Sequence, residues 1–384
     1  MNSWRPQVFR AQRPQGIDPA TVDNAVATGN AIAAISPDIP PIFTLGHLAH
    51  YTQTSYRTLR AIVRRQISDP YRIFTIRKRP LAGTRQRFRV ICVPERSLLI
   101  IQRWINSNIL SKSKAHPSST AFAPTCSIKK AAQRHCCARW LLKVDVTSFF
   151  ESISEIQVYH VFHSLGYQPL VAFELARLCT RVGSLTPRRK RAQWRSTRAD
   201  AGLPVYRNSR LGHLPQGAPS SPMLANLAML KFDAQMTELA NQSGLVYSRY
   251  ADDITLSTDR KDFSRGEALL VLKQVYGLMG RSGLSPNTAK TKIIPPGARK
   301  IILGLLVDGS MPKLPREFKN NLRQHLYYLL DPRIGPRGHA RARGFAAVEG
   351  LKNYVGGLIA FAYDVEPEFG RRTFERFNQV PWPS

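Results

Sequence analysis

The sequence predicts an α+β fold built around an antiparallel sheet, and three stretches of the chain carry this prediction. Residues 245–257 contain two short runs of β-branched and aromatic residues on either side of a polar centre, which is the pattern of a β-hairpin. Residues 141–150 form an apolar run that ends on Asp145, the pattern of a buried strand. Residues 220–243, between them, repeat apolar residues at helical spacing. We therefore expect the strand of Asp145 to pair beside the hairpin in one sheet.

The charge of the chain is strongly positive. It has 56 lysines and arginines against 25 aspartates and glutamates, a formal net charge of +31. Such an excess repels itself unless a polyanion neutralises it, so nucleic acid is the expected partner. An anionic membrane is the alternative, but no amphipathic helix concentrates the basic residues and no apolar run reaches spanning length. The N-terminus lacks the apolar core of a secretory leader, which favours a cytoplasmic protein without a membrane partner.

The five cysteines are odd in number and show no zinc-type spacing. Reduced, mostly buried thiols are the simplest interpretation, as expected in a cytosol. They are Cys92, Cys126, Cys136, Cys137 and Cys179.

In chain order, residues 1–42 show no sustained period, so we expect an extension with at most one short helix. From Phe43 the pattern becomes helical. The arginines on the polar side of this helical region form either a solvated face or a stripe that faces RNA. They are Arg57, Arg60, Arg64 and Arg65.

Residues 71–79 and 85–94 alternate like the strands of a hairpin with a basic tip.

The middle of the chain holds a second helix-rich region and a basic segment. A helix is expected near residues 98–109 and another near 156–165, after the strand of Asp145. Residues 181–210 contain nine basic residues and one acidic residue with little periodicity. We interpret residues 181–213 as a basic insertion that becomes ordered mainly when it meets phosphates.

Residues 214–222 read Leu-Pro-Gln-Gly-Ala-Pro-Ser-Ser-Pro, a rigid turn that leads into a helix ended by Gly244. This position puts Gln216 and Gly217 on the N-terminal side of a helix, where the backbone can approach a nucleotide or a template closely.

The C-terminal part is expected to be mainly helical. After a helix at residues 267–279, residues 300–309 are predicted to form a strand with an Asp-Gly turn. Residues 316–329 then form a helix that is apolar on one side and basic on the other, as needed to lie along a nucleic-acid duplex. Its basic residues are Arg316, Lys319 and Arg323. A further core helix is marked by Leu351, Tyr354, Val355, Leu358 and Ile359.

The pair Asp252-Asp253 stands at the expected hairpin tip. An isolated Asp pair in a turn is ordinarily turn chemistry. This pair is accompanied by Asp145 and by the Pro-Gln-Gly turn, and two adjacent like charges are usually balanced by a divalent metal ion.

A strand ending in Asp, a Pro-Gln-Gly turn with its helix, and a Tyr-Ala-Asp-Asp hairpin, in this order, resemble the core of a reverse transcriptase. The turn at residues 214–222, the hairpin wording Tyr-Ala-Asp-Asp-Ile-Thr-Leu-Ser and the segment 161–167 are similar in particular to bacterial retron-type enzymes. The resemblance covers roughly residues 45–360. Two departures are Ala131, where those enzymes have Asn in Asn-Ala-x-x-His, and Ile-Leu-Gly at 302–304, where many have Val-Thr-Gly.

The resemblance implies a right-hand polymerase of fingers, palm and thumb with an antiparallel, ferredoxin-like palm sheet. The implied divisions are an N-terminal extension at 1–42, fingers at 43–140, a palm at 141–310 with the basic insertion at 181–213, and a thumb and C-terminal region at 311–384.

It also implies roles for individual residues. Asp145, Asp252 and Asp253 would hold two Mg²⁺ ions about 3.5 to 4 Å apart, with Mn²⁺ as an alternative ion. Lys290 aligns with a lysine that protonates the departing pyrophosphate, with Lys292 as the second choice.

Substrate-binding roles are implied for a second group. Lys78 and Arg89 fall where the family holds the triphosphate of the incoming nucleotide. Phe150 matches the aromatic residue beneath the sugar, where a large ring leaves no room for a 2′-hydroxyl and predicts a preference for deoxynucleotides. Gln216, Gly217 and Tyr250 complete the substrate site.

Nucleic-acid binding is expected of Arg316, Lys319 and Arg323 on the thumb helix. His135 ends the element that resembles Asn-Ala-x-x-His, and it is either an RNA-recognition residue or a structural histidine. The segment 300–309 corresponds to the hairpin that grips the primer.

By resemblance, such an enzyme would copy a structured non-coding RNA into a branched RNA-DNA hybrid, msDNA, and stay bound to it in an anti-phage system with an effector protein. Its substrates would be deoxynucleoside triphosphates, and a homo-oligomer within a larger complex is a further expectation. Two alternatives stay open: another bacterial reverse transcriptase, of the diversity-generating or abortive-infection type, or mainly a nucleic-acid-binding scaffold that restrains an effector.

Overall fold

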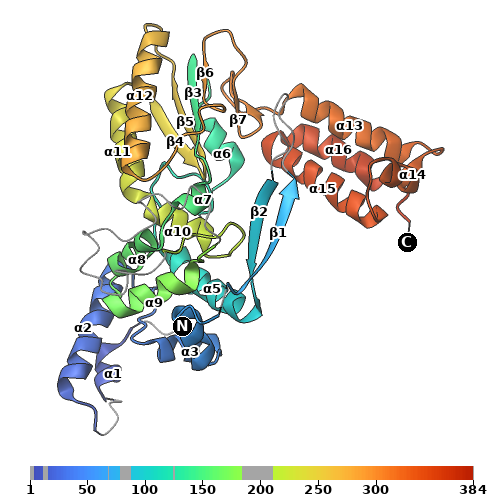
Figure 1. Ribbon diagram of the computed structural model, residues 1–384. Coiled ribbons are helices and arrows are strands. Elements are labelled where there is room, and N and C mark those ends of the chain that lie inside the picture. The colour runs from blue at the N-terminus through green and yellow to red at the C-terminus, as the bar shows by residue number, and fades with distance from the viewer. Residues whose placement is uncertain are drawn as a thin grey trace.

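The computed structural model describes residues 4–11, 16–67, 69–77, 88–123, 126–183 and 211–383. Figure 1 shows a sheet with helices packed against it, a separate long β-hairpin, and a helical bundle that contains the C-terminus. A large apolar core joins the N-terminal helices to the sheet, and a smaller core joins the bundle to Ala132, Leu141 and the segment 302–307. The predicted tip of the first hairpin, with Lys78, and most of the basic insertion lie outside the described residues.

The central sheet consists of β3 (Trp140–Asp145), β4 (Val246–Tyr250), β5 (Asp253–Thr258) and β6 (Lys292–Ile294). The strand order is β4-β5-β3-β6, and all neighbouring pairs are antiparallel. With helices between β3 and β4 and between β5 and β6, this is the β-α-β-β-α-β connectivity of a ferredoxin-like sheet. The predicted α+β fold with an antiparallel ferredoxin-like sheet is confirmed.

The two faces of the sheet differ because side chains alternate along each strand. Leu142, Val144, Ile254 and Leu256 are at most 1% exposed and share one face, since Leu142 pairs with Leu256 and Val144 with Ile254. Figure 1 shows α11 (Leu230–Gln242) and α12 (Arg265–Arg281) along this side of the sheet. On the opposite face, Asp145 pairs with Asp253 at one end of β3, and the buried Leu141 pairs with Ser257 toward the other end.

The single helix predicted after the Pro-Gln-Gly turn is two helices in the structure. The segment after the Pro-Gln-Gly turn forms α10 (Ser221–Ala228) and then α11, with a break at Met229. The break lets α10 contact α8 (Glu155–Ser164) while α11 runs along β4.

The N-terminal region holds α1 (Pro6–Ala11) and α2 (Pro19–Ile35), so the prediction of at most one short helix there is wrong. Asp18 caps α2, and Val22, Val26 and Ile32 are buried on one side of it. Alanine and glycine between these residues dilute the apolar period, which is why the sequence pattern is weak.

Between α2 and α10 the chain forms a series of further helices. They are α3 (Leu45–Thr52), α4 (Tyr56–Val63), α5 (Arg96–Asn108), the 3-10 turn η1 (Leu110–Lys112), α6 (Ile128–Gln133), α7 (Phe149–Ser152), α8 and α9 (Pro169–Cys179). Two of the arginines near α4 are partly buried and paired with glutamates. Arg60 bonds Glu174 at 2.9 Å and Arg65 bonds the fully buried Glu155 at 2.5 Å. These ion pairs tie α4 to α8 and α9.

The first hairpin pairs β1 (Tyr71–Arg77) with β2 (Phe88–Pro94) in antiparallel register, as predicted. Figure 1 shows it extending from α5 toward the C-terminal bundle.

The segment 300–309 differs from its prediction as a single strand with an Asp-Gly turn. It forms β7 (Ile301–Ile302) and β8 (Leu305–Leu306), and the turn lies at Leu303 and Gly304, whose φ angles are both positive (49° and 85°). Positive φ at both central residues is the requirement of a two-residue type I′ turn.

The C-terminal bundle consists of α13 (Arg316–Leu330), α14 (Gly335–Ala342), α15 (Val348–Val365) and α16 (Pro367–Asn378). Leu322, Leu326 and Leu329 of α13 are buried against it, as predicted. Tyr354, expected in the core, is 43% exposed.

None of the five cysteines forms a disulfide. Only Cys92 and Cys179 are buried, so the prediction of mostly buried thiols is wrong. In the part of the chain that the structure describes, none of the helices has both the length and the apolar character that crossing a membrane requires.

Candidate active site

Three predicted site residues lie in one row across the sheet. Asp145, the last residue of β3, pairs with Asp253 at the start of β5, and Asp253 pairs with Tyr250 at the end of β4. Residues directly opposite each other in antiparallel strands point to the same face, with Cβ atoms about 4.5–5.5 Å apart. The structure therefore brings Asp145 to the tip of the hairpin on the face not covered by α11 and α12.

Asp252 completes the acidic group from the turn itself. Ala251 adopts a left-handed conformation with φ 54°, and the carbonyl oxygen of Asp252 accepts a hydrogen bond from the amide of Val146 at 2.9 Å. This bond fixes the turn to the residue that follows Asp145. Burial raises the pKa of Asp252, and the Asp253 and Asp145 carboxylates raise it further. Burial also raises the pKa of Asp253, against the opposing effect of Lys143.

Both carboxylate oxygens of Asp145 have partners from the segment before β6. Lys290 Nζ donates to Oδ2 at 2.7 Å, and Asn287 Nδ2 donates to Oδ1 at 2.8 Å. The amide of Asn287 also donates to the carbonyl of Asp145 at 2.7 Å. Lys290 is thus placed beside the acidic row, whereas Lys292 lies on β6 opposite Lys143. Sequence reasoning had not singled out Asn287, although it stands three residues before Lys290 in the same motif.

A cavity of about 760 Å³ opens in front of this row. Asp145, Asp252 and Lys290 line one side, and Arg89 and Gln216 line it as well. Six of the predicted residues therefore line one cavity: Arg89, Asp145, Phe150, Gln216, Asp252 and Lys290. Asp253, Gly217 and Tyr250 are not among its lining residues, and Lys78 lies outside the described part of the chain.

Gly217 serves the packing of the Pro-Gln-Gly turn against β2. Its φ is 108°, and a Cβ at this position would lie 2.8 Å from Cγ2 of Ile91. The carbonyl of Gln216 accepts a hydrogen bond from the amide of Cys92 at 2.7 Å. Glycine is needed here because the turn lies against the strand that brings Arg89 to the cavity.

Phe150 and Tyr250 belong to an aromatic group at the edge of the cavity. Phe150 lines the cavity, and its ring centroid lies 6.2 Å from that of Phe122. Phe122 lies 6.3 Å from Tyr250. Sequence reasoning missed Phe122, which stands in the irregular stretch at residues 111–139 where no period points to it.

A buried ion pair supports the hairpin from behind. Arg249 and Asp233 are 0% exposed and joined at 2.6 Å, and Tyr247 donates a second hydrogen bond to Asp233 at 2.7 Å. The sequence did contain a signal for this pair. Strand alternation places Arg249 on the apolar face, opposite to Tyr250, where a charge needs a partner.

His135 does not lie at a nucleic-acid surface, so its predicted contact with RNA is corrected. It is 1% exposed, and its two ring nitrogens bond the hydroxyls of Ser257 and Ser248, each at 2.7 Å. Burial lowers the pKa of His135 to about 3. The residue is a neutral link between α6 and the strands of the hairpin.

The basic side chains of α13 differ in how far they are free to contact nucleic acid. Arg316 and Arg323 are exposed, and Arg323 lies over the ring of Phe369 at 5.5 Å. Lys319 instead pairs with Glu366 at 2.6 Å and lies over the same ring, which ties α13 to α16. The structure thus gives Lys319 a partner inside the bundle.

The donor set of the acidic row suits a hard divalent ion, since Mg²⁺ prefers carboxylate oxygens. Among the described residues, no three acidic, histidine or cysteine side chains form a ready-made ion site. At Asp145, Lys290 and Asn287 donate hydrogen bonds to both carboxylate oxygens. The residues fit a magnesium site that requires Lys290 to release Asp145.

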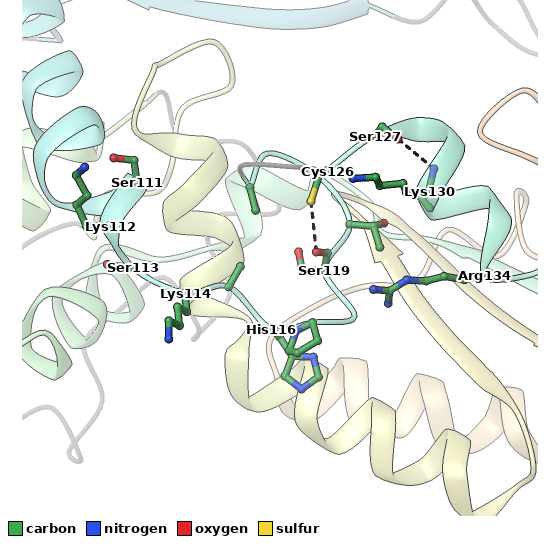
Figure 2. Close-up of a pocket in the computed structure, with 15 residues that line it drawn as sticks. Ser111, Lys112, Ser113, Lys114, His116, Ser119, Cys126, Ser127, Lys130 and Arg134 are labelled. Atoms are coloured by element: carbon green, nitrogen blue, oxygen red, sulfur yellow. Dashed lines mark hydrogen bonds between the residues drawn. The ribbon is translucent and has the colours of Figure 1, made fainter. Parts of the chain in front are cut away.

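A second hollow, of about 550 Å³, lies along residues 111–134 (Figure 2). Lys112 and Lys114 stand at one side of it, and Lys130 and Arg134 stand at the other. Its lining residues include Ser119, Thr120 and Ala123, which stand on either side of Phe122 in the chain.

Comparison with known proteins gives a consistent set of matches. The family model described as "Reverse transcriptase (RNA-dependent DNA polymerase)" matches residues 76–305, from β1 to β8. Retron Ec86 reverse transcriptase of Escherichia coli is 31% identical over 340 residues, which cover 88% of this chain and 94% of that protein. Retron Mx65 reverse transcriptase of Myxococcus xanthus is 30% identical over 75% of this chain and 61% of its own length. Retron Ec83 reverse transcriptase of Escherichia coli is 23% identical over 85% and 93%.

Proposed function

From the premise that this chain belongs to the reverse transcriptases and, within them, to the retron group, we propose that it copies a structured non-coding RNA into a branched RNA-DNA hybrid and stays bound to it. The chain is an RNA-directed DNA polymerase. The RNA partner, the branched product and an anti-phage role are proposed on the strength of the relatives named retron enzymes.

The observation that carries the polymerase chemistry is the row Tyr250, Asp253 and Asp145 with Asp252 at the turn. Asp145, Asp252 and Asp253 would hold Mg²⁺, with Mn²⁺ as the alternative ion. Bound there, the metal would supply charge neutralisation for a triphosphate and lower the pKa of an attacking hydroxyl. The burial that raises the pKa values of Asp252 and Asp253 is offset once a cation is bound.

The chain's own residues position the substrate. Arg89 lines the cavity with a guanidinium suited to phosphate oxygens, and Lys78 is assigned the same role from the sequence. The ring of Phe150 is assigned to the position beneath the sugar, where it would exclude a 2′-hydroxyl. Gln216, Gly217 and Tyr250 border the nucleotide. Lys290 is assigned to give a proton to the departing pyrophosphate once its ammonium has released Asp145, and its position beside Asp145 supports this assignment.

We assign the fingers to residues 43–140, the palm to 141–310 with the insertion at 181–213, and the thumb to 311–384. In this assignment the exposed Arg316 and Arg323 of α13 face the backbone of a duplex. Lys319 is left out of this contact because it pairs with Glu366.

Asp252→Asn tests the polymerase assignment. Extension of a DNA primer on an RNA template should fall below detection, while RNA affinity in a filter-binding assay stays within twofold of wild type. Asp259→Asn, on an exposed residue just beyond the other end of β5, is the matched control and should retain full activity. Primer extension by Asp252→Asn near the wild-type level would contradict the assignment.

The retron assignment has its own test. RNA that copurifies with the chain should carry DNA joined through a 2′-hydroxyl, and this linkage should be lost in Asp252→Asn. We place the reaction in the cytoplasm, with a neighbouring effector protein as partner and a homo-oligomer as the assembly. Copurified RNA without branched DNA would instead favour a diversity-generating or abortive-infection type of enzyme.

A further inference from the structure

Phe122 combines an unfavourable backbone with an exposed ring. Its φ is 65°, in the left-handed region that bulky residues rarely adopt. Its residue surface is 45% exposed, so burial of the ring does not account for the conformation. Backbone conformations of this kind persist only where the surroundings hold them, and they concentrate at functional sites.

The loop before Phe122 is held from several directions. The amide of Thr120 donates to the carbonyl of Arg249 at 2.8 Å, and Asn226 Nδ2 donates to the carbonyl of Ala121 at 2.7 Å. Ser119 donates to Asn226 Oδ1 at 2.8 Å. Asn226 and Ser119 also contact the buried guanidinium of Arg249, which is paired with Asp233. The loop is therefore anchored to the strand that ends at Tyr250.

The position of the ring relates it to the substrate. Its centroid lies 6.2 Å from Phe150 and 6.3 Å from Tyr250, so the three rings form a continuous aromatic edge from the cavity to the hairpin tip. Phe150 is among the described residues that line the cavity in front of Asp145, and Phe122 is not among them. The free surface of Phe122 is thus outside the space assigned to the incoming nucleotide and next to it, on the side of Tyr250.

We propose that Phe122 binds the 3′-terminal nucleotide of the growing DNA strand, whose sugar and base edge rest on its ring. This inference rests on the proposed polymerase function and goes beyond it by assigning a residue to the strand end. An aromatic face suits this role because contact with a ring does not depend on which base is present. The anchored loop then explains why the ring stays in place although much of it is exposed.

Four variants test the proposal with the full chain, a DNA primer annealed to an RNA template, and single-nucleotide extension. Phe122→Asn removes the ring but suits left-handed backbone, which asparagine tolerates well. Phe122→Ala removes the ring alone, and Phe122→Trp retains an aromatic face. Leu270→Ala is the matched control, because Leu270 is 65% exposed on α12, on the covered side of the sheet.

Phe122→Asn and Phe122→Ala should need at least about fivefold more primer-template for half-maximal extension, as expected for the loss of one ring contact. Their KM for the nucleotide triphosphate should stay within twofold, and Phe122→Trp and Leu270→Ala should behave like wild type. Phe122→Asn should unfold at the wild-type temperature or above, because it relieves the backbone. This combination separates lost substrate contact from lost folding.

Wild-type behaviour of Phe122→Asn toward the primer-template would overturn the proposal, as would a loss confined to the KM for the nucleotide. A loss in Phe122→Asn accompanied by a lower unfolding temperature would also overturn it, because the ring would then be structural. Failure of the wild-type chain to extend any primer would count against the polymerase function and not against Phe122.

Discussion

The ammonium of Lys290 lies 2.7 Å from Oδ2 of Asp145, while Asn287 Nδ2 lies 2.8 Å from the other oxygen of the same carboxylate. The residue assigned to proton transfer and the residue assigned to metal binding are therefore one ion pair. A cation that binds Asp145 must compete with Lys290, so the two assigned roles are coupled.

Lys290→Met should lower the rate of single-nucleotide extension by about a hundredfold or more at saturating Mg²⁺, the usual effect of losing a general acid. The same variant should bind the metal at a lower concentration, because the competing ammonium is gone. Thermal unfolding titrated with Mn²⁺ measures the second effect without relying on activity. Lys292→Met, on the neighbouring strand, is the matched variant, and an equal loss in both would contradict the assignment of Lys290.

Asp252→Asn should leave the metal-free protein as stable as wild type or more stable at pH 7. Burial and the Asp253 and Asp145 carboxylates raise the pKa of Asp252, so its charged form opposes folding above its unfolded pKa. The stability difference should shrink as the pH falls through the raised pKa, because protonated Asp252 is neutral like asparagine. Unfolding temperatures at several pH values check this. A stability difference between Asp252→Asn and wild type that grows toward acid pH would contradict the prediction that charged Asp252 opposes folding.

His135→Ala should lower the free energy of unfolding at pH 7 by roughly 2 kcal/mol or more, since the hydroxyls of Ser248 and Ser257 lose their partner. RNA affinity at pH 7 should not change, because His135 is buried. Urea denaturation and filter binding measure the two quantities, and His160→Ala, on an exposed residue of α8, is the control. A selective loss of RNA affinity in His135→Ala would restore the RNA-recognition role.

The contribution of His135 to the stability of the protein should depend on pH. Burial lowers the pKa of His135 to about 3, whereas the unfolded chain takes up a proton near 6.5. Unfolding therefore binds a proton between these values, and the contribution of His135 to stability is lost as the pH falls from about 6.5 toward 3. The difference between wild type and His135→Ala should narrow across this window.

Glu155→Gln should destabilise the chain by about 3–5 kcal/mol, because Arg177 is buried and would lose its carboxylate partner. Burial by itself would raise the pKa of Glu155, but Arg65 and Arg177 lower it overall. The stabilisation is thus present above the unfolded pKa and is lost as the pH falls through the lower folded pKa. Urea denaturation at pH 7 measures it, with the exposed Glu375→Gln as control. A change below 1 kcal/mol would mean that the ion pairs contribute little.

Much of the sheet could be predicted because local pattern determines it. The strand of Asp145 and the hairpin of Asp252 each carry their own apolar runs, and the ferredoxin-like order was implied by the family resemblance. The break at Met229 and the turn at Leu303 could not be predicted, since each depends on what α10 and β7 pack against.

The sequence by itself determined the α+β class, the acidic residues, the Pro-Gln-Gly turn and the basic character of the chain, because each is written in neighbouring residues. Only the tertiary structure decided that His135 is buried between two serines, that Lys319 and Arg65 are paired inside the protein, and that Phe122 stands beside Phe150 and Tyr250. Burial and pairing of a side chain are set by segments far along the chain, so no local pattern can reveal them.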